Sequence, residues 1–282
     1  MAATVELNHL VRLLDDDSEL VREAVRRQLE GMKRELPEKL ASLDRPLSAD
    51  EEAIMADMLA TSRREDLEDC WMSWRRQETA EGQIESALAQ LAAFLSGWKT
   101  RVRELPEKLD ELVAQIVADF DGKNPNARQL SEWLFGGRGD AARFRGNSKD
   151  YYAPENSNML WVVAKGLGNP ISLCTMYRLL GRRMGLVIEG CNFPGHFLAR
   201  VVHEDQIWLV DCFNRGRFML ATDVARHHPA SNPAMEDLVH RPAVTESILI
   251  RFLRNLDDAF DKRGQMSERQ LMRRLVVKLM EE

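Results

Sequence analysis

The feature that most constrains the fold of this chain is the segment 169–213, in which a helix pattern gives way to strand patterns. The helix pattern, "NPISLCTMYRLLGRRM", begins with Asn169, a good N-cap residue, and with Pro170, which suits a first helical turn. Gly185 then supplies a C-terminal stop. Three apolar stretches follow, "LVIEG", "HFLARVV" and "QIWLVDCF", with the polar turn "HEDQ" between the last two. The pattern predicts an α+β fold in which a helix packs on an antiparallel sheet.

The residues on both sides of this segment carry helical patterns. Ser48 and Glu51 fit a capping box that opens one helix, and near Gly122 the chain turns rich in Gly, Asn, Pro and Asp, which indicates loops. Further helical periodicity occurs at 65–76, 81–98 and 106–120. The expected regions are a helical N-terminal part at 1–121, a core at 122–241 and a helical hairpin at 242–282.

Two further signals mark helix starts. The heptamer "RELPEKL" occurs at Arg34–Leu40 and again at Arg103–Leu109, and both copies place Pro where a helix would begin. Because the flanking residues do not match, a duplicated module remains only one interpretation of this repeat. In the tail, Ser267 and Gln270 fit a capping box before the last apolar stripe.

Composition excludes several classes of protein. The 282 residues carry a net charge of −6, with 44% apolar and 30% charged residues, which is typical of a soluble globular protein without a basic nucleic-acid footprint. No apolar run is long enough to span a membrane, and the first residues lack a signal-peptide pattern. The four cysteines form no CxxC pair, so we expect no zinc site, no cofactor, and reduced thiols in a cytoplasm.

The strand patterns place two chemically interesting residues close together. His196 stands at the start of one apolar stretch and Asp211 at the end of the next, and adjacent strands bring such positions together. A His oriented by an Asp is the acid–base half of a nucleophilic triad. The pair therefore raises the question of a third, nucleophilic residue.

A series of short motifs across Phe144–Gly216 carries a family resemblance: "FRGN", "YYAPENS", "GNPISL", "RMGLVIEG", "PGHFL" and "DCFNRG". This series resembles the transglutaminase-like proteins of the bacterial SirB type, whose module also accompanies some F-box proteins. The resemblance implies a papain-like core, a HEAT-like helical leader and a tetratricopeptide-like tail. It also implies that His196 and Asp211 occupy the His and Asp positions of a triad whose Cys lies at a helix N-terminus.

The Cys position of that resemblance falls on a residue without a nucleophile. In the wider superfamily a Cys precedes the Leu-Gly end of the helix by about fifteen residues, and fifteen residues before Gly185 stands Pro170. Cys174 lies one turn further on, about 5.4 Å of rise away, within an apolar pattern typical of a buried thiol. Cys191 has no helix start to activate it, and Cys212 should face away from Asp211.

Polar loop residues near these motifs are candidates for binding a ligand. They are Arg145, Asn147, Asn156 and Asn169. Such residues can hold a ligand, although Asn is also an ordinary turn former. We identify no metal-ligating set, because the His and Cys residues lack the spacing of one.

Three functional hypotheses follow. The first is a non-catalytic, regulatory protein whose cleft binds a peptide or protein partner through His196 and Asp211. The second is a cysteine hydrolase or acyltransferase in which Cys174 or Cys191 serves this pair, which requires a sulfur within about 4 Å of the imidazole. The third is a purely structural helical scaffold. The oligomeric state stays open at this stage.

Overall fold

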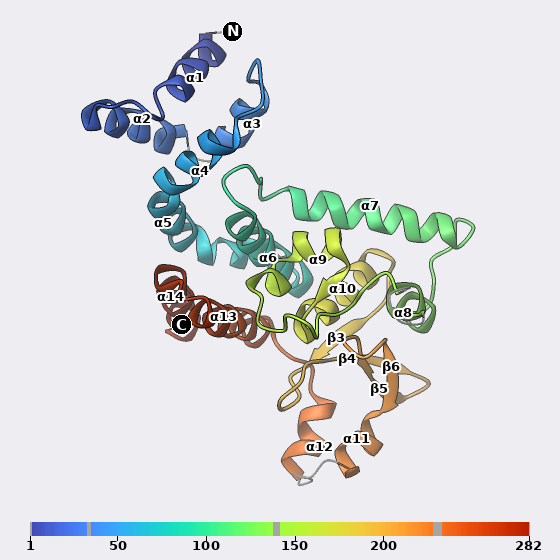
Figure 1. Ribbon diagram of the computed structural model, residues 1–282. Coiled ribbons are helices and arrows are strands. Elements are labelled where there is room, and N and C mark those ends of the chain that lie inside the picture. Colours follow the sequence, from blue (N-terminus) through green and yellow to red (C-terminus); the bar gives the residue numbers. More distant parts are fainter. Residues whose placement is uncertain (1, 33–34, 138–141, 228–232, 282) are drawn as a thin grey trace.

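The computed structural model describes residues 2–32, 35–137, 142–227 and 233–281, and Figure 1 shows helices at one end of the molecule and a small sheet toward the other. The helices are α1 Ala2–Arg12, α2 Glu19–Met32, α3 Leu36–Ala41, α4 Ala49–Met58, α5 Ala60–Cys70, η2 Trp71–Arg76, α6 Ala80–Ser96, α7 Glu104–Asp119, α8 Ala127–Phe135, η4 Pro154–Ser157, α9 Met159–Lys165, α10 Pro170–Arg183, α11 Ala221–His227, α12 Pro233–His240, α13 Thr245–Lys262 and α14 Met266–Met280. The strands are β1 Arg145–Gly146, β2 Leu167–Gly168, β3 Ile188–Cys191, β4 Leu198–His203, β5 Gln206–Asp211 and β6 Arg217–Leu220.

The central helix α10 starts and packs as the sequence predicts. Asn169 is its N-cap, and the side chains of Asn169 and Ser172 form a reciprocal capping box, with Pro170 in the first turn. The helix is buried along most of its length and packs on β3 and β4. The antiparallel sheet runs in the order β3-β4-β5-β6. The α+β class, with a helix packed on an antiparallel sheet, is therefore confirmed.

The turn between β4 and β5 also follows the prediction from "HEDQ". His203 pairs with Gln206, and the two residues between them, Glu204 and Asp205, both have positive φ angles. Positive φ at both central residues is the geometry of a type I′ hairpin, which suits the twist of the flanking strands.

Two features of the sheets were not predicted. β6 is only four residues long, "RFML", and its pattern does not alternate in burial, so pairing with β5 rather than its own sequence defines it. The second sheet is a two-residue parallel pair, in which Gly146 of β1 lies opposite Gly168 of β2. This small sheet holds Arg145 and Gly146 beside the two residues that precede Asn169, the N-cap of α10.

The two C-terminal helices pack onto the body of the molecule. α13 contacts α6 and α10, and α14 lies along α5, where Arg64 pairs with Glu268 at 3.0 Å and Arg274 with Glu68 at 2.9 Å. The predicted start of the last helix is wrong: α14 begins at Met266, and no side chain caps it. Among the described residues, no helix is both long and apolar enough to cross a lipid bilayer.

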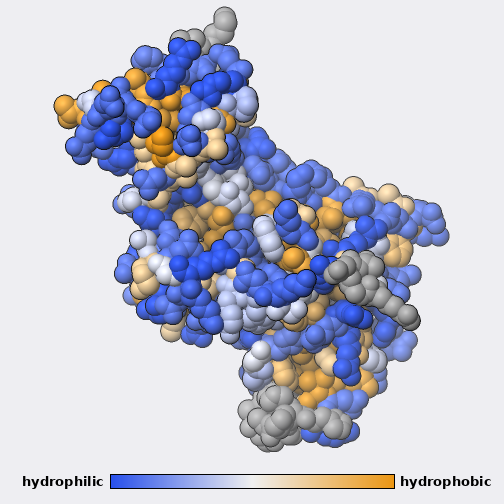
Figure 2. Space-filling view, in the orientation of Figure 1, coloured by the Kyte–Doolittle hydropathy of each residue, from blue (hydrophilic) through white to orange (hydrophobic). Residues whose placement is uncertain are grey.

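Buried side chains fall into separate clusters. The largest one runs from Leu67 to Leu279 and joins α6, α10, the sheet and the tail. A second, around Leu29 and Met55, belongs to the leader helices α1–α4 and includes Trp98. Figure 2 shows apolar surface on these leader helices and again toward the sheet end of the molecule, with hydrophilic surface over much of the rest of this face. The division into 1–121, 122–241 and 242–282 stays a prediction.

Candidate functional site

The sheet brings His196 and Asp211 into contact. His196 lies in the turn before β4, where Gly195 has a φ of +70° and the His196 amide donates to the carbonyl of Phe193 at 3.1 Å. Asp211 ends β5, the neighbouring strand. The His196 Nε2 atom lies 2.8 Å from Oδ1 of Asp211. The predicted pair is thus a hydrogen-bonded pair at one end of the sheet.

Asp211 is held as a carboxylate by its neighbours. Its Oδ1 also accepts from the backbone N–H of Asn214 at 3.0 Å, and its Oδ2 accepts from the side-chain Nδ2 of Asn214 at 2.8 Å. Burial by itself would raise the pKa of Asp211, but the hydrogen bonds from His196 and Asn214 outweigh burial, so the pKa lies below its ordinary value. Asp211 is therefore ionised at neutral pH.

The ionised carboxylate decides which ring nitrogen of His196 carries the proton. A carboxylate only accepts hydrogen bonds, so Nε2 must donate and a neutral imidazole keeps its lone pair on Nδ1. Among the described residues, Nδ1 has no hydrogen-bond partner, and the His196 side chain keeps 25% of its surface exposed. Nδ1 is therefore available to a group from outside the chain.

Aromatic rings form the surroundings of the imidazole. The ring of Phe213 meets His196 edge-on at 6.3 Å between centroids and meets Tyr151 at 6.0 Å. Phe213 lies flat against Gly146, where an added Cβ would come within 2.5 Å of the ring. Tyr151 and Tyr152 are 44% and 48% exposed. An aromatic surface therefore extends from His196 to solvent.

The start of α10 lies close to this pair. Gly168 pairs with Gly146, against which Phe213 packs, and Pro170 follows two residues later. One turn into the helix, Sγ of Cys174 lies 3.4 Å from the carbonyl of Phe197, the residue after His196. The second turn of α10 is therefore in contact with the residue that follows His196.

Comparison with known proteins identifies the core. The family model of the transglutaminase-like superfamily matches residues 103–254, which is more than half of the chain. The chain belongs to this superfamily. The predicted transglutaminase-like resemblance is confirmed at this level.

Relatives of the superfamily protein include both bacterial and animal chains. A UPF0162 protein of Xylella fastidiosa is 38% identical over 124 residues, which cover 42% of this chain and 44% of the relative. F-box only protein 21 of Mus musculus is 41% identical over 120 residues, covering 43% of this chain and 18% of the relative. The match thus spans less than half of the length of these relatives. No solved structure matches the chain.

The cysteines of this transglutaminase-like core are buried. Cys174 is 2% exposed, and Cys191 and Cys212 are fully buried. Burial raises the pKa of Cys191 to about 12 and that of Cys212 well above its ordinary value, the latter helped by the neighbouring Cys174. None of these sulfur atoms makes a hydrogen bond with His196 in the part of the chain that the structure describes. Burial thus favours the protonated thiols of Cys191 and Cys212.

Three of the four loop residues predicted to bind a ligand are joined in one internal network. Asn147 Nδ2 donates to Asn156 Oδ1 at 2.9 Å, and Asn156 Nδ2 donates to the carbonyls of Asp150 and Tyr151. Asn169 Nδ2 donates to Ser157 Oγ at 2.8 Å. These amides hold the loop before α10 in place. Arg145 lies in β1, at the edge of the same region, and it too interacts with a neighbouring group.

Sequence reasoning missed three residues that shape this site: Tyr151, Phe213 and Asn214. The signals were present in "KDYYAP" and "DCFN", which follow the residues already singled out. Among the described residues, no group of three or more His, Cys, Asp and Glu side chains is placed to hold a metal ion.

Proposed function

We propose that this transglutaminase-like protein is a non-catalytic, regulatory member of its superfamily that binds a peptide or protein segment at the His196–Asp211 pair. The observation that carries the proposal is a hydrogen-bonded His–Asp pair with an open Nδ1 beside a helix that begins with Pro170. Proline offers no nucleophile to the imidazole. The pair then serves recognition instead of bond cleavage.

The chemistry of the pair suggests what it recognises. In its neutral form the imidazole presents a hydrogen-bond acceptor at Nδ1, which a peptide N–H can satisfy. Beside it, Tyr151 and Phe213 form an aromatic surface of the kind that anchors peptide side chains. An extended peptide with an apolar or aromatic side chain next to a free backbone N–H fits both features.

Panning of a random peptide phage library on the immobilised protein tests this proposal. We expect enriched peptides to bind the wild-type chain and to lose at least about tenfold in affinity with His196→Ala, in line with the loss of one buried hydrogen bond and its packing. Arg254→Gln, a substitution of an exposed Arg on α13, is the matched control and should leave binding unchanged. Synthetic peptides measured by fluorescence polarisation give the affinities.

Two outcomes would contradict the proposal. One is the absence of any enriched peptide, and the other is a set of peptides that bind His196→Ala as tightly as the wild type.

A thiol survey addresses the alternative of a cysteine hydrolase. With a cysteine-directed electrophile at neutral pH, we expect Cys70, the one described cysteine that is not buried, to react first. Fast labelling of Cys174 or Cys191 that His196→Ala abolishes would instead support the enzyme.

We further infer that the chain is of the SirB type, that its leader is HEAT-like and its tail tetratricopeptide-like, and that it acts in a bacterial cytoplasm. The helices α1–α5 and the helical hairpin α13–α14 support the helical character of the leader and the tail in this description.

A further inference from the structure

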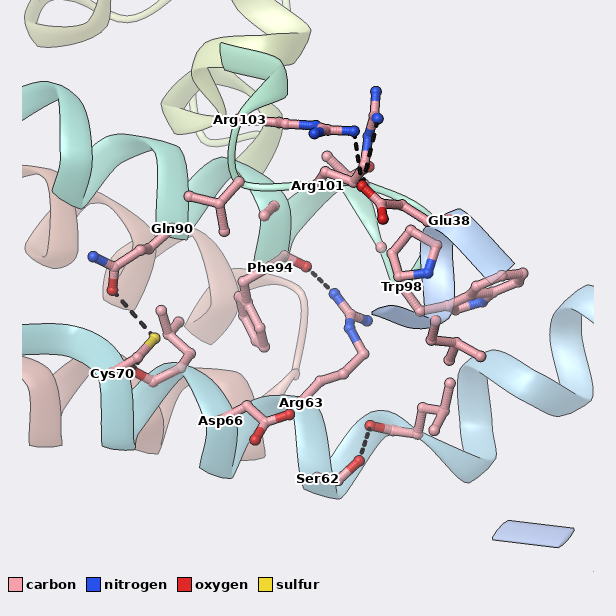
Figure 3. A pocket seen from close by; sticks show the side chains of 18 of the residues that line it. Glu38, Ser62, Arg63, Asp66, Cys70, Gln90, Phe94, Trp98, Arg101 and Arg103 are labelled. Carbon is pink, nitrogen blue, oxygen red and sulfur yellow. Dashed lines mark hydrogen bonds and ion pairs between the residues drawn. The ribbon is translucent and has the colours of Figure 1, made fainter. Parts of the chain in front are cut away.

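A cavity of about 430 Å³ lies between the leader helices and the body of the molecule, remote from His196 in the chain. Helices α2, α3, α5 and α6 and the loop 97–103 form its walls, and Figure 3 shows it from close by. Its apolar lining includes Leu29, Leu36, Leu59, Phe94, Trp98 and Val102. This volume falls within the range of cavities that hold small molecules.

One cation, Arg63, projects from α5 into this cavity (Figure 3). Its guanidinium stacks over the ring of Phe94, 5.4 Å from the centroid, and its Nη2 atom donates to the Phe94 carbonyl near the end of α6. A guanidinium has five N–H donors, so most of this fork is left for another acceptor. Among the described residues, no carboxylate pairs with Arg63.

The other charged groups of the lining already have partners. Glu38 pairs with Arg103 at 2.7 Å, which links the two copies of "RELPEKL" across the rim. Glu30 pairs with Arg26 at 2.7 Å, and Asp66 has a partner as well. Burial lowers the pKa of Arg63, with further lowering by Arg64 and an opposing effect of Glu268. Arg63 is thus a partly desolvated positive charge that forms no ion pair with a carboxylate in the part of the chain that the structure describes.

We propose that this cavity is a binding site for a small amphiphilic carboxylate, whose apolar body lies among the leucines and Trp98 and whose carboxylate meets the Arg63 fork. A planar carboxylate matches the paired N–H groups of a guanidinium. The apolar side chains of the walls would contact the apolar body of the ligand, and the guanidinium of Arg63 would bind its carboxylate head group. This site is independent of the His196–Asp211 pair.

Calorimetric titration of the full chain with decanoate and with decanol, which share one apolar chain, tests the charge requirement. We expect decanoate to bind about tenfold or more tightly than decanol, the ratio that one charge-assisted hydrogen bond supplies. Cys70, whose thiol lies in the lining beside Gln90, gives a second readout. Decanoate should slow its alkylation by N-ethylmaleimide, whereas decylammonium at the same concentration should not.

Substitution of Arg63 locates the head group. Arg63→Met should remove the preference for decanoate while leaving decanol affinity within about twofold, and the control Arg254→Gln should keep the preference. Arg63 also links α5 to α6, so Arg63→Met could fail to fold. In that case Arg63→Lys, which keeps the positive charge, replaces it in the titrations. Equal affinity of the wild type for decanoate and decanol, no binding of either, or an unchanged preference in Arg63→Met would overturn the proposal.

Discussion

At the scale of single residues, Asp211 is the residue of the candidate site that hydrogen-bonds to both His196 and Asn214. Its carboxylate accepts from His196 Nε2 and from two groups of Asn214, and it thereby fixes both the imidazole and the turn after β5. The contact between His196 and Asp211 was predictable, because the start of one antiparallel strand and the end of the next lie at the same end of a sheet. Asn214 and Phe213 were not, because their roles depend on how the turn after Asp211 folds back.

Asp211→Asn should destabilise the native state by about 1–2 kcal/mol at pH 7, since a charge-assisted network becomes neutral. The folded-state pKa of Asp211 is lowered, so the carboxylate contributes stability above the ordinary pKa of 3.8 and loses it as the pH falls through the lower folded value. Urea unfolding of both proteins from pH 7 downward measures the difference, which should shrink below pH 3.8.

The exposed Asp258 on α13 provides the control for that pH series. Asp258→Asn should change the free energy of unfolding by less than about 0.5 kcal/mol at every pH. A difference between wild type and Asp211→Asn that stayed constant into acid would show that packing, not charge, is responsible.

Pro170→Cys tests the proposed position of the nucleophile directly. A thiol in the first turn of α10 would benefit from the helix N-terminus and the nearby imidazole, both of which lower a thiol pKa. In a Cys70→Ser background, we expect the pH profile of alkylation of this cysteine, which replaces a buried residue, to have its midpoint at least about one pH unit below that of Ala80→Cys, an exposed first-turn cysteine in α6 without a His beside it. His196→Ala should remove the difference, and equal midpoints for both cysteines would argue against the proposed position.

At the scale of elements, the starts of α4 and α10 were predictable because local side chains determine them. Ser48 with Glu51, and Asn169 as N-cap, form the expected caps. The start of α14 was not, because the backbone turn that ends α13 sets it instead of a side-chain cap: Gly264 has a φ of +68°, and the Gln265 amide donates back to the carbonyl of Phe260. This tight turn starts α14 before Ser267.

Asn169→Ala should cost more stability than Asn126→Ala, although both residues are N-caps with capping boxes. Asn126 is exposed, so its loss should cost about 1 kcal/mol. Asn169 is 5% exposed and also holds Ser157, so its loss leaves a buried hydroxyl without its partner and should cost about 2–4 kcal/mol. Thermal or urea unfolding of the two variants compares them, and equal costs would show that the buried network adds nothing.

At the scale of the whole molecule, the leader helices and the body have separate hydrophobic cores. The tail, in contrast, shares the large core with α10 and the sheet. Sequence periodicity predicted helices in each of these regions, although not the short helices α9, α11 and α12, and it did not predict which helices pack together. Packing between distant segments, such as α14 on α5, depends on complementary faces and ion pairs that no local pattern reveals.

A matched pair of substitutions tests this division. Leu29→Ala in the leader core and Leu256→Ala in the body core each remove a fully buried leucine, at a typical cost of about 2–5 kcal/mol. In hydrogen exchange, Leu29→Ala should accelerate exchange in α1–α4 and leave β3–β5 protected, whereas Leu256→Ala should accelerate exchange in α10, α13 and the sheet together. Sheet amides that respond equally to both substitutions would indicate one cooperative unit.

The proline at the head of α10 removes more than a side-chain nucleophile. A residue in the first turn of a helix also carries a free backbone N–H, which is the kind of donor that stabilises an oxyanion during acyl transfer, and proline has none. A cysteine brought to His196 from elsewhere in the chain would regain the thiol without that donor. Only replacement of Pro170 itself would return both at once.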